Sequence, residues 1–128
     1  LGEPRQEQVL FYEHALAIQD IALHTIRPGI PCAQVDQAVM RYYEENDLML
    51  YWRHHTGHSV GFAKHESPFF DQNDQTIIQP GMVFTIEPGL YVAGLGGFRL
   101  SDTVAVTETG VEKITYYPTQ IDQIICDP

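Results

Sequence analysis

The chain has 128 residues, of which 44% are hydrophobic and 19% are charged, so it predicts one globular domain with an apolar core rather than a disordered chain. Seven Lys and Arg against seventeen Asp and Glu give a formal net charge of -10, which disfavours nucleic acid or an anionic membrane surface as a partner. The apolar runs are far shorter than the roughly 20 residues that span a bilayer, so we expect no membrane-spanning helix.

Two amphipathic helices are predicted in the first third of the chain. Over residues 6–27 the apolar residues recur at spacings of three and four, and the Pro28-Gly29 pair then stops the helix. The apolar face consists of Phe11, Ala15, Ile18, Ala22 and Ile26. A second helix is expected over residues 33–45, and the two helices should pack against each other in antiparallel fashion.

After Leu48, Gly, Pro, aromatic and β-branched residues replace the helical pattern, which predicts a sheet. The expected strands are residues 82–86, 90–92, 97–107 and 111–115, with the last two joined as a hairpin through residues 108–110. Residues 57–80 are rich in His, Asp, Gln and Pro and predict a loop with short strands, of the kind that carries functional residues. Neither a linker nor a repeat divides residues 1–128, so we treat them as one unit.

Four of the six histidines lie close together, at His54, His55, His58 and His65. Imidazole serves as a metal ligand and as an acid or base, but it is also a common structural hydrogen-bonding group, so each histidine alone is compatible with a purely structural role. Gly57 precedes His58 and permits a close approach of backbone or ligand.

Glu87 follows an apolar strand and is held by the Pro-Gly pair at residues 88–89. A lone carboxylate at a strand end is usually a surface residue. Together with the histidines, however, it provides ligands that suit divalent Mn, Fe, Co or Zn. Further along, strand alternation predicts that Arg99 and Ser101 share one face while Asp102 lies on the other; an edge strand with a polar solvent face is the alternative interpretation.

Three motifs occur in a characteristic order: Gly57-His58-Ser59-Val60-Gly61 followed by His65-Glu66, then residues 80–91, and then residues 97–103. In this order they resemble the M24-type metallopeptidases of the pita-bread fold, most closely the Xaa-Pro aminopeptidases and Xaa-Pro dipeptidases (prolidases). The resemblance covers nearly the whole chain. It implies an α+β fold that is the C-terminal half of a pita-bread (creatinase/aminopeptidase-like) domain, with two helices packed on a curved, mostly antiparallel sheet. It also implies that residues 1–128 are the C-terminal portion of a longer catalytic domain.

The resemblance implies that the parent protein hydrolyses the peptide bond preceding proline, with divalent metal ions (Mn, Co or Zn). Carried over residue by residue, His58 and Glu87 match metal ligands with catalytic roles, and His65 matches a catalytic histidine that contacts substrate and stabilises the oxyanion. His54 and Arg99 match substrate-binding positions. Imidazole and carboxylate groups suit these roles chemically.

Two departures from the family pattern stand out. The paired Asp ligands of the family precede the first helix seen here, so this chain lacks them and the fragment alone is expected to be inactive. Ser101 stands where a second ligand glutamate is expected, and a neutral hydroxyl is a poor substitute for a bridging carboxylate. Asp102 cannot replace it, because strand alternation directs it to the opposite face. Whether the fragment itself binds any metal stays open.

Two other functions remain open within the same fold. One is a metal-free, creatinase-like hydrolase of a small C–N substrate, in which His58 is the general acid and base and Glu87 its partner. The other is a non-catalytic pita-bread module that binds protein or peptide. Outside that fold, a small structural α+β domain is the remaining alternative. We further expect the substrate to be a peptide or a small C–N molecule. An exposed apolar face predicts a homo-oligomer. Cys32 and Cys126 suit reduced cysteines better than a disulfide, so we expect a cytoplasmic protein.

Overall fold

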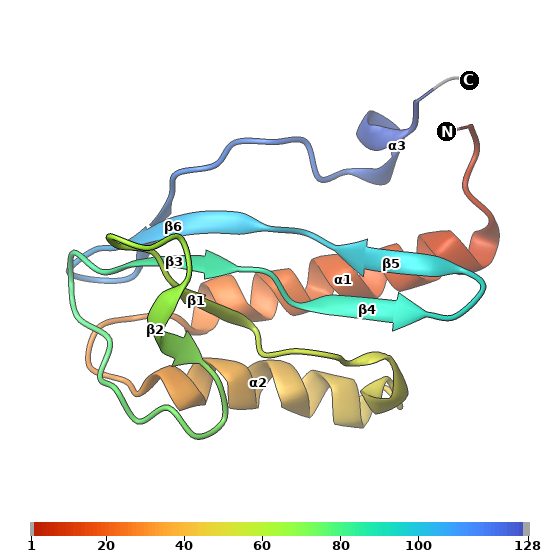
Figure 1. The fold of residues 1–128 in the computed structure, drawn as a ribbon. Coiled ribbons are helices and arrows are strands. Elements are labelled where there is room, and N and C mark those ends of the chain that lie inside the picture. The colour runs from red at the N-terminus through yellow and green to blue at the C-terminus, as the bar shows by residue number, and fades with distance from the viewer. Residues whose placement is uncertain (1, 127–128) are drawn as a thin grey trace.

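Two helices lie side by side along one face of the strands in the computed structural model, which describes residues 2–126 (Figure 1). They are α1 (Gln6–Thr25) and α2 (Cys32–Glu45), followed by a short 3-10 helix, η1 (Met49–Tyr51). The two predicted helices are thus confirmed, although α1 ends two residues before the predicted limit because Ile26 already has an extended backbone. In the described part of the chain, no helix has the length and apolarity needed to cross a membrane.

The helices bury the apolar stripes that their sequence spacing predicts. Ala15, Ile18 and Ala22 of α1 are 1% exposed or less, and Val35 and Val39 of α2 are equally well buried. They belong to one core cluster with residues of the strands, which contribute Phe70, Phe84, Ile86, Leu90 and Val104. Burial of apolar surface between helices and sheet is therefore the main source of stability for the scaffold.

Within residues 2–126, seven strands form two antiparallel sheets. The larger sheet has the order β2-β1-β3-β6-β7, and the smaller consists of β4 and β5. Their bounds are β1 (Gly57–Ser59), β2 (Glu66–Phe70), β3 (Val83–Ile86), β4 (Gly89–Val92), β5 (Gly96–Arg99), β6 (Asp102–Val106) and β7 (Val111–Lys113); a four-residue helix, α3 (Ile121–Ile124), follows. The predicted α+β fold, with two helices on a mostly antiparallel sheet, is confirmed, as is the hairpin between β6 and β7.

One strand prediction is wrong. Residues 97–107 do not form a single strand but divide into β5 and β6, which belong to different sheets. The ladder from β3 to β6 stops at the pair Ile86–Asp102 and resumes between β4 and β5 at the pair Gly89–Arg99. The cause lies on the opposite strand, because Pro88 has no N–H to donate and the Glu87 N–H donates to the Thr56 carbonyl instead. We call this gap in both strands, at residues 87–88 and 100–101, the double break.

Asp102 lies at the edge of the double break and points into the protein, where it is 5% exposed. Its carboxylate accepts hydrogen bonds from Gln19 Nε2 at 2.9 Å and Thr115 Oγ1 at 2.8 Å, and it forms an ion pair with Lys113 Nζ at 3.0 Å. The network therefore ties α1 to β6 and β7. Burial alone would raise the pKa of this carboxyl, but the hydrogen bonds from Gln19, Lys113 and Thr115 and the charge of Lys113 lower it below its ordinary value of 3.8.

We expect Asp102→Asn to lower the free energy of unfolding at pH 7 by about 2 kcal/mol, since the carboxylate receives charge-assisted hydrogen bonds. A folded-state pKa below the unfolded one contributes stability above the unfolded pKa and loses it as the pH falls through the folded pKa. The difference between wild type and variant should therefore shrink below about pH 4. Urea denaturation of both proteins at pH 7, 5 and 3 measures this difference in the free energy of unfolding. An equal difference at all three pH values would contradict the assignment.

Candidate active site

The double break brings Glu87 and Ser101 together beneath His58 of β1. Glu87 Oε1 lies 3.2 Å from His58 Nε2, and Ser101 Oγ donates to Glu87 Oε2 at 3.2 Å. The His58 side chain is 8% exposed and that of Glu87 is 22% exposed, so an almost buried imidazole meets a carboxylate that solvent and ligands can reach. The structure thus brings together the two residues that the sequence predicts as metal ligands, with the Ser101 hydroxyl beside them.

The orientation of the His58 ring is fixed by its other nitrogen. His58 Nδ1 lies 3.0 Å from the Ser59 carbonyl oxygen. A carbonyl can only accept, so Nδ1 carries the proton and Nε2 faces Glu87. Metal-ligating histidines commonly hold their tautomer in this way, and the same orientation suits proton exchange between Nε2 and a carboxylate.

A close backbone approach holds β1 against β3 at this point. A Cβ at Gly57 would overlap the Thr85 carbonyl oxygen and lie 3.0 Å from its carbonyl carbon, so only glycine fits. Behind it, Thr56 donates to the buried Asp36 carboxylate from both its N–H (3.0 Å) and its hydroxyl (2.6 Å). The Thr56 carbonyl also accepts a hydrogen bond from the Glu87 N–H. Thr56 therefore links Asp36 of α2 to the backbone of the candidate site.

The exposed His65 packs against His58. Its ring centre is 4.1 Å from that of His58, 5.3 Å from Phe69 and 6.0 Å from His55. His65 thus lies beside the proposed ligand pair, as the sequence predicts. Burial, followed by the neighbouring His54 and His65, lowers the pKa of His55 below its ordinary value of 6.5, so this ring is neutral at pH 7.

The structure pairs His54 with Tyr91. His54 Nε2 lies 2.7 Å from the Tyr91 hydroxyl, and its Nδ1 lies 2.9 Å from the His55 carbonyl oxygen. A Cβ at Gly89 or Gly97 would meet the Tyr91 ring at 2.9 to 3.2 Å, so these glycines leave room for the tyrosine. Sequence reasoning did not select Tyr91; its place four residues after Glu87, between closely spaced glycines, is the signal that was available.

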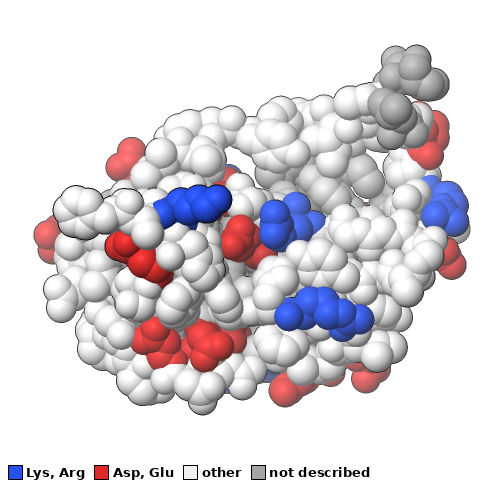
Figure 2. Space-filling view, in the orientation of Figure 1, with Lys and Arg blue, Asp and Glu red and all other residues white. Residues whose placement is uncertain are grey.

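Arg99 is exposed on the same side of the chain as Ser101, while Leu100 and Asp102 are buried, which confirms the predicted alternation of faces despite the break. Arg99 lines a hollow of about 420 Å³ together with Ser101, Tyr116 and Tyr117. On the face seen in Figure 2, basic side chains are interspersed with acidic ones. This mixed surface does not form the single-signed patch that nucleic-acid binding needs.

The side chains of the candidate site are of the right chemical type to bind a divalent metal ion, but few of them are present. Among residues 2–126, no group of three or more His, Cys, Asp or Glu residues is arranged to hold a metal. His58 and Glu87 supply an imidazole and a carboxylate, which are suitable ligands, whereas Ser101 adds only a neutral hydroxyl. Further ligands for such an ion would have to come from outside the described residues.

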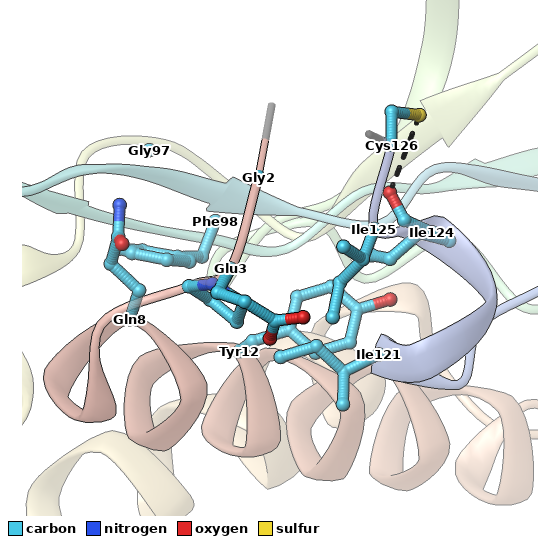
Figure 3. Close-up of a pocket in the computed structure, with 11 residues that line it drawn as sticks. Gly2, Glu3, Gln8, Tyr12, Gly97, Phe98, Ile121, Ile124, Ile125 and Cys126 are labelled. Carbon is cyan, nitrogen blue, oxygen red and sulfur yellow. Dashed lines mark hydrogen bonds between the residues drawn. The ribbon is translucent and has the colours of Figure 1, made fainter. Parts of the chain in front are cut away.

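A second hollow lies at the far end of the molecule, between the start of α1, β5 and α3 (Figure 3). It has a volume of about 440 Å³ and is walled mainly by Tyr12, Phe98 and three isoleucines of the C-terminal segment. The Tyr12 hydroxyl donates to the Thr119 carbonyl oxygen at 2.7 Å and so attaches this segment to α1. None of the predicted site residues lines the hollow, which is therefore separate from the candidate site.

Comparison with known proteins gives consistent matches. The sequence model of metallopeptidase family M24 matches residues 1–108. The Xaa-Pro dipeptidase of Pyrococcus furiosus is 38% identical over 115 residues, which are 90% of this chain and 33% of that protein. A probable dipeptidase, PepE, of Mycobacterium bovis is 36% identical over 121 residues, which are 94% of this chain and 32% of that protein.

Solved structures share the fold. The prolidase from Pyrococcus horikoshii has a TM-score of 0.89 at 36% identity, over 92% of this chain and 34% of that one. The X-Pro aminopeptidase from Thermotoga maritima has a TM-score of 0.89 at 28% identity, over 94% of this chain and 34% of that one. The chain thus spans about a third of the length of the curated relatives it matches.

Proposed function

Since this chain belongs to metallopeptidase family M24, we propose that the protein containing it hydrolyses the peptide bond that precedes proline in Xaa-Pro dipeptides or peptides. The observation that carries the proposal is the approach of His58 to Glu87 of the double break at 3.2 Å, with the His65 ring packed against that of His58. The similarity to an Xaa-Pro dipeptidase over 90% of the chain supports the choice of substrate. Residues 1–128 are then the C-terminal portion of the catalytic domain.

In this proposal His58 and Glu87 hold a divalent ion, Mn, Co or Zn, jointly with ligands elsewhere in the protein. Such an ion polarises the scissile carbonyl and lowers the pKa of a bound water. The groups are held beforehand, because the Ser59 carbonyl orients the His58 ring, the Thr56 carbonyl holds the Glu87 backbone, and the Ser101 hydroxyl donates to the Glu87 carboxylate. Little reorganisation is therefore needed when substrate binds.

The remaining predicted residues bind or orient substrate. His65 is exposed and lies against His58, so it can donate a hydrogen bond to the carbonyl oxygen as negative charge develops there. Arg99 is exposed beside Ser101 and offers a bidentate donor to a substrate carboxylate. His54 is held by the Tyr91 hydroxyl of β4, and we assign it a substrate-binding role.

Ser101 favours a second candidate function. Its neutral hydroxyl adds no charge beside Glu87, and His58 and Glu87 form a direct imidazole–carboxylate pair. Such a pair performs acid and base chemistry by itself. A metal-free hydrolase of a small C–N substrate would use His58 as acid and base, with Glu87 as its partner.

One experiment tests the proposal and separates the two candidates. The full-length protein is purified and assayed for bound metal and for hydrolysis of Xaa-Pro dipeptides, with Ser101 and as Ser101→Glu. We expect the unmodified protein to bind divalent metal and to lose activity to a chelator, and the isolated 128-residue chain, tested alongside, to show no turnover. Metal binding gained only with Ser101→Glu would favour the metal-free function. Robust metal-dependent turnover by the isolated chain would contradict its expected inactivity.

A further inference from the structure

A hollow of about 630 Å³ opens directly beside His65. It lies between the loop before β1 and the turn that follows β2, and its lining includes His55, His65, Phe69 and Asp71. His65 lines this hollow and is also part of the candidate active site, since its ring centre lies 4.1 Å from that of His58. A group bound in this hollow is therefore adjacent to the candidate active site.

The walls of the hollow are aromatic. The Phe69 ring centre lies 5.5 Å from that of His55 and 5.3 Å from that of His65. This arrangement results from the irregular pairing of β1 with β2, in which His58 faces Phe69 and the register shifts at the next residue. Ring faces pack well against the methylene groups of a long side chain, and aromatic rings attract a cation placed over them.

Two carboxylates, those of Asp71 and Asp74, line the hollow, and the basic group that faces Asp71 is the His55 imidazole. Asp71 Oδ1 accepts from Asn73 N at 3.0 Å, a local turn contact that leaves the charge of the carboxylate in place. The oxygens of Asp74 accept from the backbone N–H groups of Phe69 and Thr76. Among the ion pairs of residues 2–126, none involves Asp71 or Asp74. Figure 2 shows acidic side chains gathered at the lower left, over the end of β2.

We propose that this hollow binds the side chain of Xaa in an Xaa-Pro substrate and selects lysine or arginine there. The inference rests on the proposed function. Proline has an uncharged, compact side chain, so Xaa is the residue that a hollow lined by carboxylates can distinguish. The Phe69 and His55 rings contact the methylene stem of the bound side chain, and the Asp71 carboxylate faces its cationic end.

The test compares kcat/KM of the full-length protein for Lys-Pro, norleucine-Pro and Glu-Pro. Norleucine matches the lysine stem and lacks only its charge. We expect Lys-Pro to exceed norleucine-Pro by about fivefold, the size of effect that a partly exposed ion pair provides, and Glu-Pro to be the poorest substrate. The preference for Lys-Pro should shrink at high ionic strength, because salt screens exposed charges.

Asp71→Asn is the matched variant, because the asparagine oxygen can still accept from Asn73 N and keep the turn. We expect it to reduce the Lys-Pro to norleucine-Pro ratio to near one, while Asp122→Asn, at an exposed position on α3, leaves the ratio unchanged. Equal hydrolysis of all three dipeptides, or a ratio insensitive to Asp71→Asn, would overturn the inference and leave the proposed function intact. Failure to hydrolyse any Xaa-Pro dipeptide would overturn both.

Discussion

Gly57→Ala should lower the free energy of unfolding by about 3 kcal/mol or more, at the upper end of what overpacking a buried site costs. The added methyl group would overlap the backbone carbonyl of Thr85, which cannot move without displacing β3. Because His58 follows Gly57 in β1 and Glu87 follows β3, the two strands can separate only by lengthening the 3.2 Å contact between these side chains. The variant should therefore lose activity as well as stability.

Chemical denaturation of wild type and Gly57→Ala measures the first effect, and dipeptide hydrolysis by the full-length protein measures the second. Gly110→Ala is the control, since an added Cβ there meets nothing within 4 Å and the backbone is not strained. It should change stability by no more than about 0.5 kcal/mol. If Gly57→Ala unfolded at the same denaturant concentration as wild type, the close contact between β1 and β3 would not exist in solution.

His58→Gln should reduce kcat/KM of the full-length protein for Xaa-Pro dipeptides by about 10³-fold, within the range for loss of an acid–base or ligand group. The glutamine amide cannot exchange a proton near pH 7 and is a weaker donor to metals than imidazole. Because His58 bonds chiefly to its neighbour Ser59 and to Glu87, the loss should arise in the chemistry rather than in folding.

His24→Gln is the matched control, because His24 is exposed at the end of α1 and its imidazole pairs with Asp20 of the same helix, away from the candidate site. It should retain full activity. Bound metal measured in parallel separates the two candidate functions, since a ligand role for His58 also predicts loss of metal. Activity of His58→Gln within a factor of about three of wild type would remove His58 from the mechanism.

Local patterns predict the helices and the short strands well, because each depends on residues close in sequence. The stripe that includes Ala15 and Ile18 is buried as its spacing requires. The division of residues 97–107 was not predictable from that segment alone, because its cause is Pro88 on the opposite strand. The alternation nevertheless holds, since Ser101 is exposed while Leu100 and Asp102 are buried.

The candidate site was partly predictable for the same reason. His58, His65, Glu87 and Ser101 lie in motifs that are contiguous in sequence, and the structure places them together. Asp71 could not be selected, because its approach to His65 depends on how β2 folds back onto β1. The roles assigned to the site residues and the expected homo-oligomer stay predictions.

At the double break, strand pairing and ligand binding depend on different parts of the chain. Residues 87 and 101 lie outside the strand ladders, and the backbone N–H of residue 87 is satisfied by Thr56 whatever side chain it carries. Exchange of the side chains there changes the donors offered to a ligand while leaving strand pairing and the core untouched. Such a position is open to evolutionary change, so a carboxylate, a hydroxyl or another group can be sampled at residue 101 with little loss of foldability, and new chemistry can arise on an old scaffold.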